Sequence, residues 1–479
     1  MQPESESQAR YARQRGVFPE ERRKATAVAI LGAHSHPVLG SFAMAGLAGM
    51  GVRHLRSDFP GADAGHWIFG RYSELVHKLN PFAEYTAINY VMPGVDIRGM
   101  QKENSWIVFL AHDLEYTRYE LGELVAAGIR IPTILAVAAP GGGMAVRYPD
   151  PAHALEALRE SPPDIPGDGI EPGAPEVAEI IGGVVINEVM LGPDRPGENM
   201  AEPRILAFYS LSQARRVNVS HASGAFHELI SDISRPGRWP RGSFHGLSLG
   251  FVGAGALANW AVLPVVCDAP AAMAIHDADI VEASNLNRQL LFVGHVGQPK
   301  ASALAVELAG LSPGTSFTAM EKFVKHVDDL PLAGVHAVIC APDNDQARLI
   351  SSDASLRAGV LFACGGTSAR GGQAMVCVPP GSCFRCLAGL SGDAGDPAPA
   401  DAAIRQSCAG ENDAVLASNM VIAGIMISEL RMALAGQPTA NVRFLGNSPA
   451  GNRLSRMITR VPTCNHRKAG AVQNQEARA

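Results

Sequence analysis

The chain has 479 residues, of which 47% are hydrophobic and 18% charged, and its formal net charge at pH 7 is −6. This length allows two or three domains with sizeable cores, and the acidic balance gives no electrostatic reason to expect nucleic acid as the main partner. The first residues, MQPESESQARYARQRG, lack the apolar centre of a signal peptide, and no run of about 18 uncharged apolar residues suggests a membrane span. We therefore expect a soluble cytoplasmic protein that neither enters a membrane nor binds nucleic acid.

The first half of the chain predicts a Rossmann-like order of elements. Residues 24–59 have the pattern of a strand, a turn, a helix and a second strand, and residues 105–136 that of a further strand, helix and strand. A loop rich in proline, glycine and aspartate, residues 161–176, then leads into an apolar helix at 180–191.

The second half repeats this order. Residues 247–264, LSLGFVGAGALANWAVLP, predict a strand, a G-x-G-x-x-G/A loop with Gly253 and Gly255, and a helix. Residues 336–366 match 105–136, which pairs Asp343 with Asp113, and a crossing loop at about 387–413 leads into another apolar helix. We predict an α/β protein made of two tandem Rossmann-like domains that arose by duplication, residues 1–225 and 226–479.

The two copies differ where a nucleotide would bind. The first has GAHSHP in place of GAGALA, so His34 stands where Gly255 stands, and Ile68 falls opposite Lys300. A bulky side chain at the glycine position would obstruct a bound phosphate, which makes the first copy a degenerate scaffold. The HSHP motif also resembles the H-x-H-P of zinc isopeptidases, although Met44 occupies the place of their aspartate; turn-forming polar residues are the alternative.

The segment DADIVEASNLNRQLLF, followed by GQPK and APDN, resembles the activating-enzyme superfamily. This superfamily includes the ThiF-MoeB-HesA sulfur-carrier activators and the ubiquitin-activating enzymes. Its members share a glycine loop, D-x-D, S-N-L-x-R-Q, G-x-x-K and D-N, and all five occur here in that order. The resemblance covers essentially the whole chain, with the first half similar to the inactive adenylation domain of eukaryotic-type enzymes.

The resemblance implies a reaction in which the C-terminal carboxylate of a protein attacks the α-phosphate of ATP, giving an acyl adenylate and pyrophosphate. Charge gathers in the transition state, so Mg²⁺ and preorganised cations are expected. By resemblance, Asp277 would bind the ribose hydroxyls and Asp343 would take Mg²⁺, with Asn344 beside the nucleotide. The triphosphate would be held by three side chains: Asn285, Arg288 and Lys300. The remaining nucleotide-binding residues implied by the shared motifs are Gly253, Gly255, Asp279, Ser284 and Gln289.

The segment RYARQ, residues 10–14, resembles the family's R-Y-x-R-Q motif. In family dimers its second arginine, here Arg13, reaches into the partner's ATP site. The segment before the second glycine loop has no such motif, so one half keeps the arginine and the other keeps the site. This complementarity suggests a pseudo-dimer within one chain; a solvated basic N-terminus is the alternative.

All eight cysteines lie in the second half, from Cys267 onward, which favours a reactive thiol or a metal site over a disulfide scaffold. Cys408 resembles the family cysteine that accepts the activated acyl group, and a nearby helix start would lower its pKa. Residues 411–413, Glu-Asn-Asp, replace the glycines usual there, so a structural loop cysteine is the alternative. Some family members adenylate without this thiol.

Cys383 and Cys386 form a C-x-x-C that resembles the family's first zinc half-site. The second should be C-P-x-C, but the chain has Val461 in place of the first cysteine of that pair, before Cys464. His466 could supply the fourth ligand of a structural zinc site, and an empty, degraded site is the alternative. Three further cysteines in strand-like runs are predicted to be core residues: Cys340, Cys364 and Cys377.

The leading hypothesis is ATP-dependent activation of a ubiquitin-like protein ending in glycine, with a conjugating enzyme as a further candidate partner. The compact layout resembles the activating enzymes of bacterial ubiquitin-like conjugation operons, such as the Bil antiphage systems. Two alternatives belong to the same superfamily: activation of a sulfur carrier and adenylation of a peptide in natural-product synthesis. An NAD-dependent oxidoreductase would use the same glycine loop but leaves SNLNRQ, Lys300 and Arg13 unexplained, and a non-catalytic scaffold leaves the intact motifs unexplained.

Overall fold

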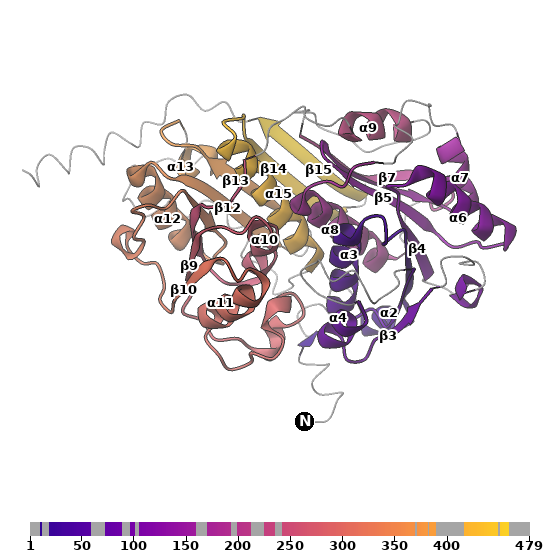
Figure 1. The fold of residues 1–479 in the computed structure, drawn as a ribbon, viewed down its shortest axis with the longest axis horizontal. Helices are drawn as coiled ribbons and strands as arrows, with labels where there is room; N and C mark the ends of the chain where they lie inside the picture. Colours follow the sequence, from indigo (N-terminus) through magenta and orange to yellow (C-terminus); the bar gives the residue numbers. More distant parts are fainter. Residues whose placement is uncertain are drawn as a thin grey trace, which may run out of the picture. The chain divides into compact units, whose positions relative to one another are not determined.

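The computed structural model describes thirteen segments: residues 10–11, 19–58, 72–88, 96–100, 105–159, 170–192, 199–211, 225–234, 242–368, 371–381, 383–388, 416–448 and 451–458. The chain divides into two compact units. Unit 1 comprises Met1–Trp239, Val415–Val421 and Phe444–Ser455, and unit 2 comprises Pro240–Ala414, Ile422–Arg443 and Arg456–Ala479. Each unit has its own sheet (Figure 1).

Unit 1 contains a seven-stranded sheet in the order β3-β2-β1-β4-β5-β6-β7, parallel from β3 to β5 and antiparallel from β5 to β7. Its strands are β1 (Ala27–Leu31), β2 (His54–Ser57), β3 (Glu84–Ala87), β4 (Ser105–Leu110), β5 (Thr133–Ala139), β6 (Gly142–Tyr148) and β7 (Arg204–Ser210). The described helices are α2 (Glu20–Ala25), α3 (Pro37–Gly49), α4 (Tyr72–Leu79), the 3₁₀ turn η2 (Arg98–Met100), α6 (Leu114–Ala126), α7 (Pro151–Arg159), α8 (Pro175–Leu191) and α9 (Ala225–Ser234).

The central strands of this sheet have apolar side chains on both faces. Every residue of β4 (SWIVFL) and β5 (TILAVAA) is buried, as expected for parallel strands whose two faces are covered by helices. The helix α6 contributes Leu114, Leu121 and Leu124 to the same core. The apolar runs in the sequence therefore became central strands, and their carboxyl ends carry the loops.

Unit 2 follows the same plan. Its sheet has the order β10-β9-β8-β11-β12-β13-β14-β15, parallel from β10 to β12 and antiparallel between β12 and β13. Its strands are β8 (Ser248–Val252), β9 (Ala272–His276), β10 (Ser316–Met320), β11 (Ala337–Cys340), β12 (Leu361–Ser368), β13 (Gly371–Cys377), β14 (Ala440–Ser448) and β15 (Gly451–Ile458). The described helices are α10 (Ala256–Val266), η3 (Ala283–Asn285), η4 (Leu290–Phe292), α11 (Lys300–Leu311), η5 (Val327–Asp329), α12 (Asp345–Ala358), α13 (Phe384–Ala388) and α15 (Leu416–Leu434).

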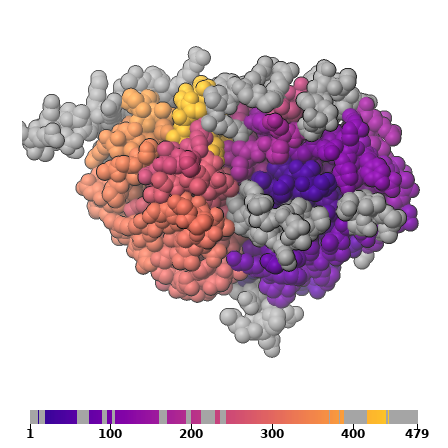
Figure 2. Space-filling model, viewed as in Figure 1, coloured from indigo at the N-terminus to yellow at the C-terminus, as the bar shows by residue number. Residues whose placement is uncertain are grey.

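The surface of unit 2 reflects this chain order. In Figure 2 the segments that follow β8 form continuous coloured areas, as expected when consecutive βα elements are neighbours in space. As predicted, Cys340, Cys364 and Cys377 are buried in the core between the sheet and its helices.

The predicted fold class, two tandem Rossmann-like α/β units, is confirmed by the matching sheet orders. In both sheets the chain runs from a central strand, β1 or β8, to two strands on one side, then crosses to β4 or β11 on the other. Such a reversal creates a switch point at the carboxyl ends of the central strands, which is where open α/β sheets bind ligands. The switch points lie between β1 and β4 and between β8 and β11.

Strand register corrects one predicted equivalence. Leu31 pairs with Phe109 in unit 1, and Val252 pairs with Cys340 in unit 2. Counting onward, His34 does match Gly255, but Asp113 matches Asn344 rather than Asp343. The roles agree with this register, since Asp113 and Asn344 each accept a backbone hydrogen bond as the N-cap of the next helix. The pairing of Asp113 with Asp343 was therefore wrong by one residue, and His112 stands where Asp343 stands.

Among the described residues, one helix, α15, is long and apolar enough to cross a membrane by length and composition. Its most apolar stretch is, however, 100% buried inside the structure. Complete burial of an apolar helix is typical of the core of a protein of this size.

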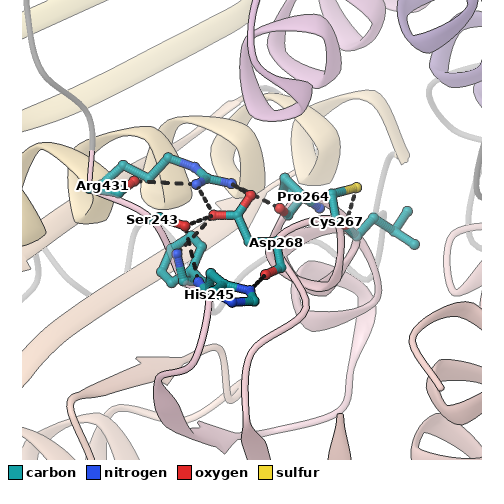
Figure 3. A network of polar contacts seen from close by, with 9 residues as sticks. Ser243, His245, Pro264, Cys267, Asp268 and Arg431 are labelled. Carbon is teal, nitrogen blue, oxygen red and sulfur yellow. Dashed lines mark hydrogen bonds and ion pairs between the residues drawn. The ribbon is translucent and has the colours of Figure 1, made fainter. Parts of the chain in front are cut away.

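The carboxyl end of α10 is fixed by the network of polar contacts in Figure 3. Arg431 of α15 forms an ion pair with Asp268 and donates to the Pro264 carbonyl oxygen, with an N···O distance of 3.0 Å. Asp268 also accepts hydrogen bonds from Ser243 Oγ at 3.1 Å and from the Phe244 N–H at 2.8 Å. The guanidinium group satisfies a last-turn carbonyl, so α10 is held firmly at the end away from its glycine loop.

Candidate functional site

The glycine loop after β8 has two glycines with different reasons to be glycine. Gly253 has φ of +88°, and a Cβ there would lie 2.9 Å from the Ala341 carbonyl carbon in the loop that follows β11. Gly255 precedes α10 with φ of −74°, and a Cβ there would meet nothing within 4 Å. Gly253 is therefore required for the close approach of the two loops, whereas Gly255 leaves open space in front of a helix N-terminus.

Asp277 fixes this loop from the end of β9. One carboxylate oxygen accepts the Ala254 N–H at 2.6 Å and the other accepts the Asp279 N–H at 2.8 Å. Burial raises the pKa of Asp277, and these two backbone hydrogen bonds oppose the rise. Both oxygens thus hold backbone, a role in shaping the loop that the sequence did not predict.

Lys300, the first residue of α11, forms an ion pair with Asp279. The Lys300 Nζ to Asp279 Oδ2 distance is 2.8 Å, and the Lys300 N–H also donates to the Asp279 carbonyl oxygen at 2.8 Å. The lysine side chain is 10% exposed and the aspartate side chain 47% exposed. A largely buried ammonium group requires such a partner, and the exposed carboxylate can be exchanged for another anion.

The polar segment 284–289 folds into a short 3₁₀ turn stabilised by its own side chains. Asn285 Oδ1 accepts the Glu282 N–H at 3.0 Å, and Ser284 Oγ donates to a Glu282 carboxylate oxygen at 3.1 Å. Asn285 is buried, so its side chain both caps the turn and lies beneath it. Part of the motif is therefore explained by local folding.

Arg288 is buried within this segment. Its guanidinium donates to the Ser284 carbonyl oxygen at 3.0 Å and to Asn287 Oδ1 at 2.8 Å. Gln289 is also buried, and its side-chain carbonyl oxygen has no hydrogen-bond partner within the described part of the chain. A buried cation with neutral partners keeps its charge available to an anion.

Asp343 and Asn344 follow β11, on the other side of the switch point, and both are exposed. Asn344 Oδ1 caps α12 by accepting the Ala347 N–H at 2.8 Å, and its amide nitrogen lies 3.4 Å from Asp343 Oδ1. Arg348 fixes the loop by donating to the Pro342 carbonyl oxygen at 2.7 Å. Asp343 therefore presents a carboxylate on a rigid turn next to the glycine loop.

The residues described so far belong to the ends of β8, β9 and β11 and to the start of α11, and they gather at one switch point. The same stretch matches the model of the ThiF family. Residues 246–468 form a ThiF-family domain. The predicted superfamily is thereby confirmed for the second half of the chain.

Relatives of the ThiF domain have known names. Over 139 residues the chain is 34% identical to the SAMP-activating enzyme E1 of Haloferax volcanii, covering 28% of this chain and 51% of that protein. Over 142 residues it is 30% identical to the sulfur carrier protein ThiS adenylyltransferase of Bacillus subtilis, covering 28% of this chain and 42% of that protein. The chain thus spans about half of the curated relatives it matches, or less.

Solved structures similar to the chain include a crystal structure of E. coli MccB with ATP. The TM-score is 0.39 and the sequence identity 15%, and the match covers 47% of this chain and 68% of that chain.

Two residues that sequence reasoning missed stand in α10 of the ThiF domain. Asn259 contacts the glycine loop and residue Leu291, and Trp260 donates its indole N–H to the Arg288 carbonyl oxygen at 3.1 Å. In the sequence both lie in a run of apolar helix residues, and no motif marks them. Only the structure brings them to the site.

The switch point of unit 1 is filled by side chains. Asp58 accepts the Gly32 N–H at 2.7 Å and the Ala33 N–H at 3.2 Å, so it holds its loop much as Asp277 does. His34 Nδ1 lies 3.2 Å from the same Asp58 carboxylate, and its ring contacts Tyr116 edge-on. The hydrogen bond from Asp58 raises the pKa of His34. An imidazole thus occupies the region that Gly255 leaves open.

Further titratable groups line this region of unit 1. Burial and the nearby Asp58 raise the pKa of Glu120 to about 8, and a hydrogen bond with Tyr116 opposes the rise. His36, which caps α3 by accepting the Leu39 N–H, packs against His112 with ring centroids 4.0 Å apart. Burial lowers the pKa of His36 to about 4. HSHP therefore forms a helix start, and the described residues contain no cluster able to hold a metal ion.

The C-x-x-C pair is in place. Cys383 and Cys386 lie at the start of α13 with their sulfur atoms 3.6 Å apart. Two thiolates bound to one tetrahedral zinc ion, with Zn–S bonds of about 2.3 Å, would be separated by a similar distance. The other ligands implied by the resemblance, Cys464 and His466, lie outside the described residues, as does Cys408.

Arg13 and Ile68 also lie outside the described residues, but the motif residue Tyr11 is described. Its ring is buried against Gly51, where a Cβ would lie 2.9 Å from Tyr11 Cζ. The Arg23 guanidinium lies over the same ring, 4.6 Å from its centroid. Gly51 has φ of +86°, so both the backbone and the ring require glycine at this position.

Proposed function

We propose that the chain is an ATP-dependent adenylating enzyme that activates the C-terminal carboxylate of a ubiquitin-like protein and then forms a thioester at Cys408. The observation that carries this proposal is the gathering of the glycine loop, Lys300 and Asp343 around one switch point in a ThiF-family domain.

The described residues fit a nucleoside triphosphate. The space in front of Gly255 and the α10 N-terminus offers backbone N–H groups to a phosphate, and no side chain occupies it. Lys300 and Arg288 supply cations, and the exposed Asp343 carboxylate is a ligand of the kind Mg²⁺ prefers. When bound, Mg²⁺ would neutralise phosphate charge at Asp343.

In the first step a substrate carboxylate oxygen bonds to the α-phosphorus of ATP, and the bond between that phosphorus and the bridging oxygen of pyrophosphate breaks. Negative charge moves to the leaving pyrophosphate, where Lys300 and Arg288 stabilise it. Arg13, carried by the first half of the chain, contributes a further cation in this proposal. The degenerate switch point of unit 1 takes no part in the chemistry.

In the second step the Cys408 thiolate attacks the acyl carbonyl carbon, a carbon–sulfur bond forms, and AMP leaves. Splitting activation from transfer in this way lets a weak electrophile reach an acceptor in two easier reactions. A structural zinc ion held by Cys383, Cys386, Cys464 and His466 would join the start of α13 to the C-terminal segment. Its role would be to stabilise the fold, since all four positions are taken by protein.

Activation of a sulfur carrier is the second candidate, because one relative is named an adenylyltransferase of the sulfur carrier ThiS. Peptide adenylation would use the same first step. Hydride transfer from NAD is disfavoured, since a dinucleotide gives no reason to gather Lys300 and Arg288 at the phosphates. A cytoplasmic location and a place in a bacterial ubiquitin-like operon belong to the same proposal.

The test is the intact mass of the protein after incubation with Mg-ATP and candidate ubiquitin-like proteins that end in glycine, with and without a thiol reductant. A reductant-sensitive adduct that is lost in Cys408→Ala supports both steps. Cys267→Ala is the matched control, because Cys267 is an exposed free cysteine outside the site. An adduct that persists in Cys408→Ala would move the thioester elsewhere, and the absence of pyrophosphate release with any candidate would contradict the first step.

A further inference from the structure

We propose that Asn259 is a positioning residue that sets the distance between the glycine loop and the segment carrying Arg288. The inference rests on the proposed adenylation, because it concerns how the triphosphate would be held. Asn259 touches neither substrate in this view and acts only through the groups that it fixes.

Asn259 joins two backbone segments by three hydrogen bonds. Its amide nitrogen donates to the carbonyl oxygens of Ala254 at 3.2 Å and Gly255 at 3.1 Å, and its amide oxygen accepts the Leu291 N–H at 3.1 Å. The side chain is 2% exposed. All the donor and acceptor atoms that these contacts use are therefore held away from water, where such bonds are strongest and most costly to lose.

Trp260 holds the same segment at a second point. Its indole N–H donates to the Arg288 carbonyl oxygen at 3.1 Å, and the Arg288 guanidinium is in turn held by Ser284 and Asn287. Consecutive residues of α10 thus fix residues 288 and 291. Because Arg431 and Asp268 fix the far end of α10, the helix is a rigid support for both segments.

Unit 1 shows that the fold does not need this arrangement. By strand register, Val38 and Leu39 stand where Asn259 and Trp260 stand. Neither side chain can form a hydrogen bond, yet unit 1 has the same strand–loop–helix–strand order. The hydrogen-bonded link between helix, loop and polar segment therefore belongs to the unit that keeps the nucleotide motifs.

The chemical consequence concerns the triphosphate rather than the base. The loop amides and Arg288 would bind different phosphate oxygens, so a change in their separation weakens both contacts together. Displacements of about 1 Å at such groups cost roughly 10²-fold in rate. Binding of the adenosine part depends on neither contact.

The experiment compares the affinity of the full chain for Mg-ATP and for adenosine in the wild type, Asn259→Ala and Asn259→Asp. Asn259→Asp keeps the acceptor for Leu291 and removes the two donors. We expect both variants to bind Mg-ATP at least about ten-fold more weakly, while adenosine affinity changes by less than about three-fold. Ser355→Ala is the matched control, since it removes a buried hydrogen bond to Ser351 at the far end of α12 and should change neither affinity.

Each other outcome is decisive. Equal loss of both affinities, or failure of both variants to fold, would make Asn259 a structural residue and overturn the inference. Unchanged Mg-ATP affinity in folded variants would overturn it while leaving the proposed function intact. A wild-type chain that binds no Mg-ATP would overturn the proposed function itself.

Discussion

Units 1 and 2 place a glycine loop, a helix and an aspartate at the same switch point and use them differently. In unit 2, Asp277 holds the loop and the space in front of Gly255 stays open. In unit 1, Asp58 holds the loop and also pairs with His34, which fills that space. The comparison teaches that folding requires the loop to be tied to the next strand, whereas nucleotide chemistry requires the region beyond it to be empty and positively charged.

The two units also differ in what surrounds the loop. Unit 2 brings Lys300 and Arg288 to its switch point. Unit 1 brings Tyr116, Glu120 and His112, which are neutral at pH 7 when buried. One site is built to attract anions and the other to satisfy itself.

The largest expected effect comes from removing the charged groups of unit 2. Arg288→Ala and Asp343→Ala should each lower ATP–pyrophosphate exchange by at least about 10²-fold, because each removes a group that meets phosphate charge. Asp113→Ala, the matching N-cap change in unit 1, should cost roughly 1 kcal/mol of stability and leave exchange unchanged. Loss of exchange in Asp113→Ala would mean that unit 1 is not a silent scaffold.

A smaller set of changes exchanges the defining residue between the two loops. Gly255→His should fold, since its φ of −74° suits any residue and its Cβ meets nothing within 4 Å, but the imidazole would occupy the phosphate region. We expect Mg-ATP to lose its stabilising effect on the melting temperature. The reciprocal His34→Gly should gain no ATP binding, because unit 1 has no counterpart of SNLNRQ. Normal ATP stabilisation of Gly255→His would show that the open space is not where phosphate binds.

The smallest effect is on the pH dependence of stability. The folded-state pKa of Glu120 is raised to about 8, so its stabilising contribution is complete below the unfolded pKa and is lost as pH rises through about 8. Glu120→Gln should raise the melting temperature at pH 9 by about 3 °C, roughly 1 kcal/mol, and change it little at pH 5. His34, Asp58 and Tyr116 face the same group, and an unchanged pH profile would assign the dependence to them.

The fold was predictable because each element carried its own signal. Glycine loops, apolar strand runs and helix caps fixed the order of β1, α3 and β2 and of β8, α10 and β9. The family motifs singled out Lys300 and Asp343, which lie at one switch point. These signals are local in sequence, and the topology then brings them together.

The remaining features depend on side-chain contacts between distant segments. Asn259 belongs to an apolar helix run, and its three partners lie in loops on either side of β9. The one-residue error at Asp113 arose because aspartate and asparagine serve equally as N-caps, so composition could not fix the register. Asp58 was missed for a similar reason, since an aspartate after a strand has no distinctive pattern until its amide partners are known.

The ion pair between Lys300 and Asp279 sets a threshold for what can enter the site. An incoming anion must displace a carboxylate that already neutralises the lysine at 2.8 Å. A triphosphate carries enough charge to win this competition, whereas a monophosphate competes less well. In the proposed reaction Asp279 would therefore recapture Lys300 once pyrophosphate has left, so that the site discriminates between fuel and spent nucleotide and favours turnover.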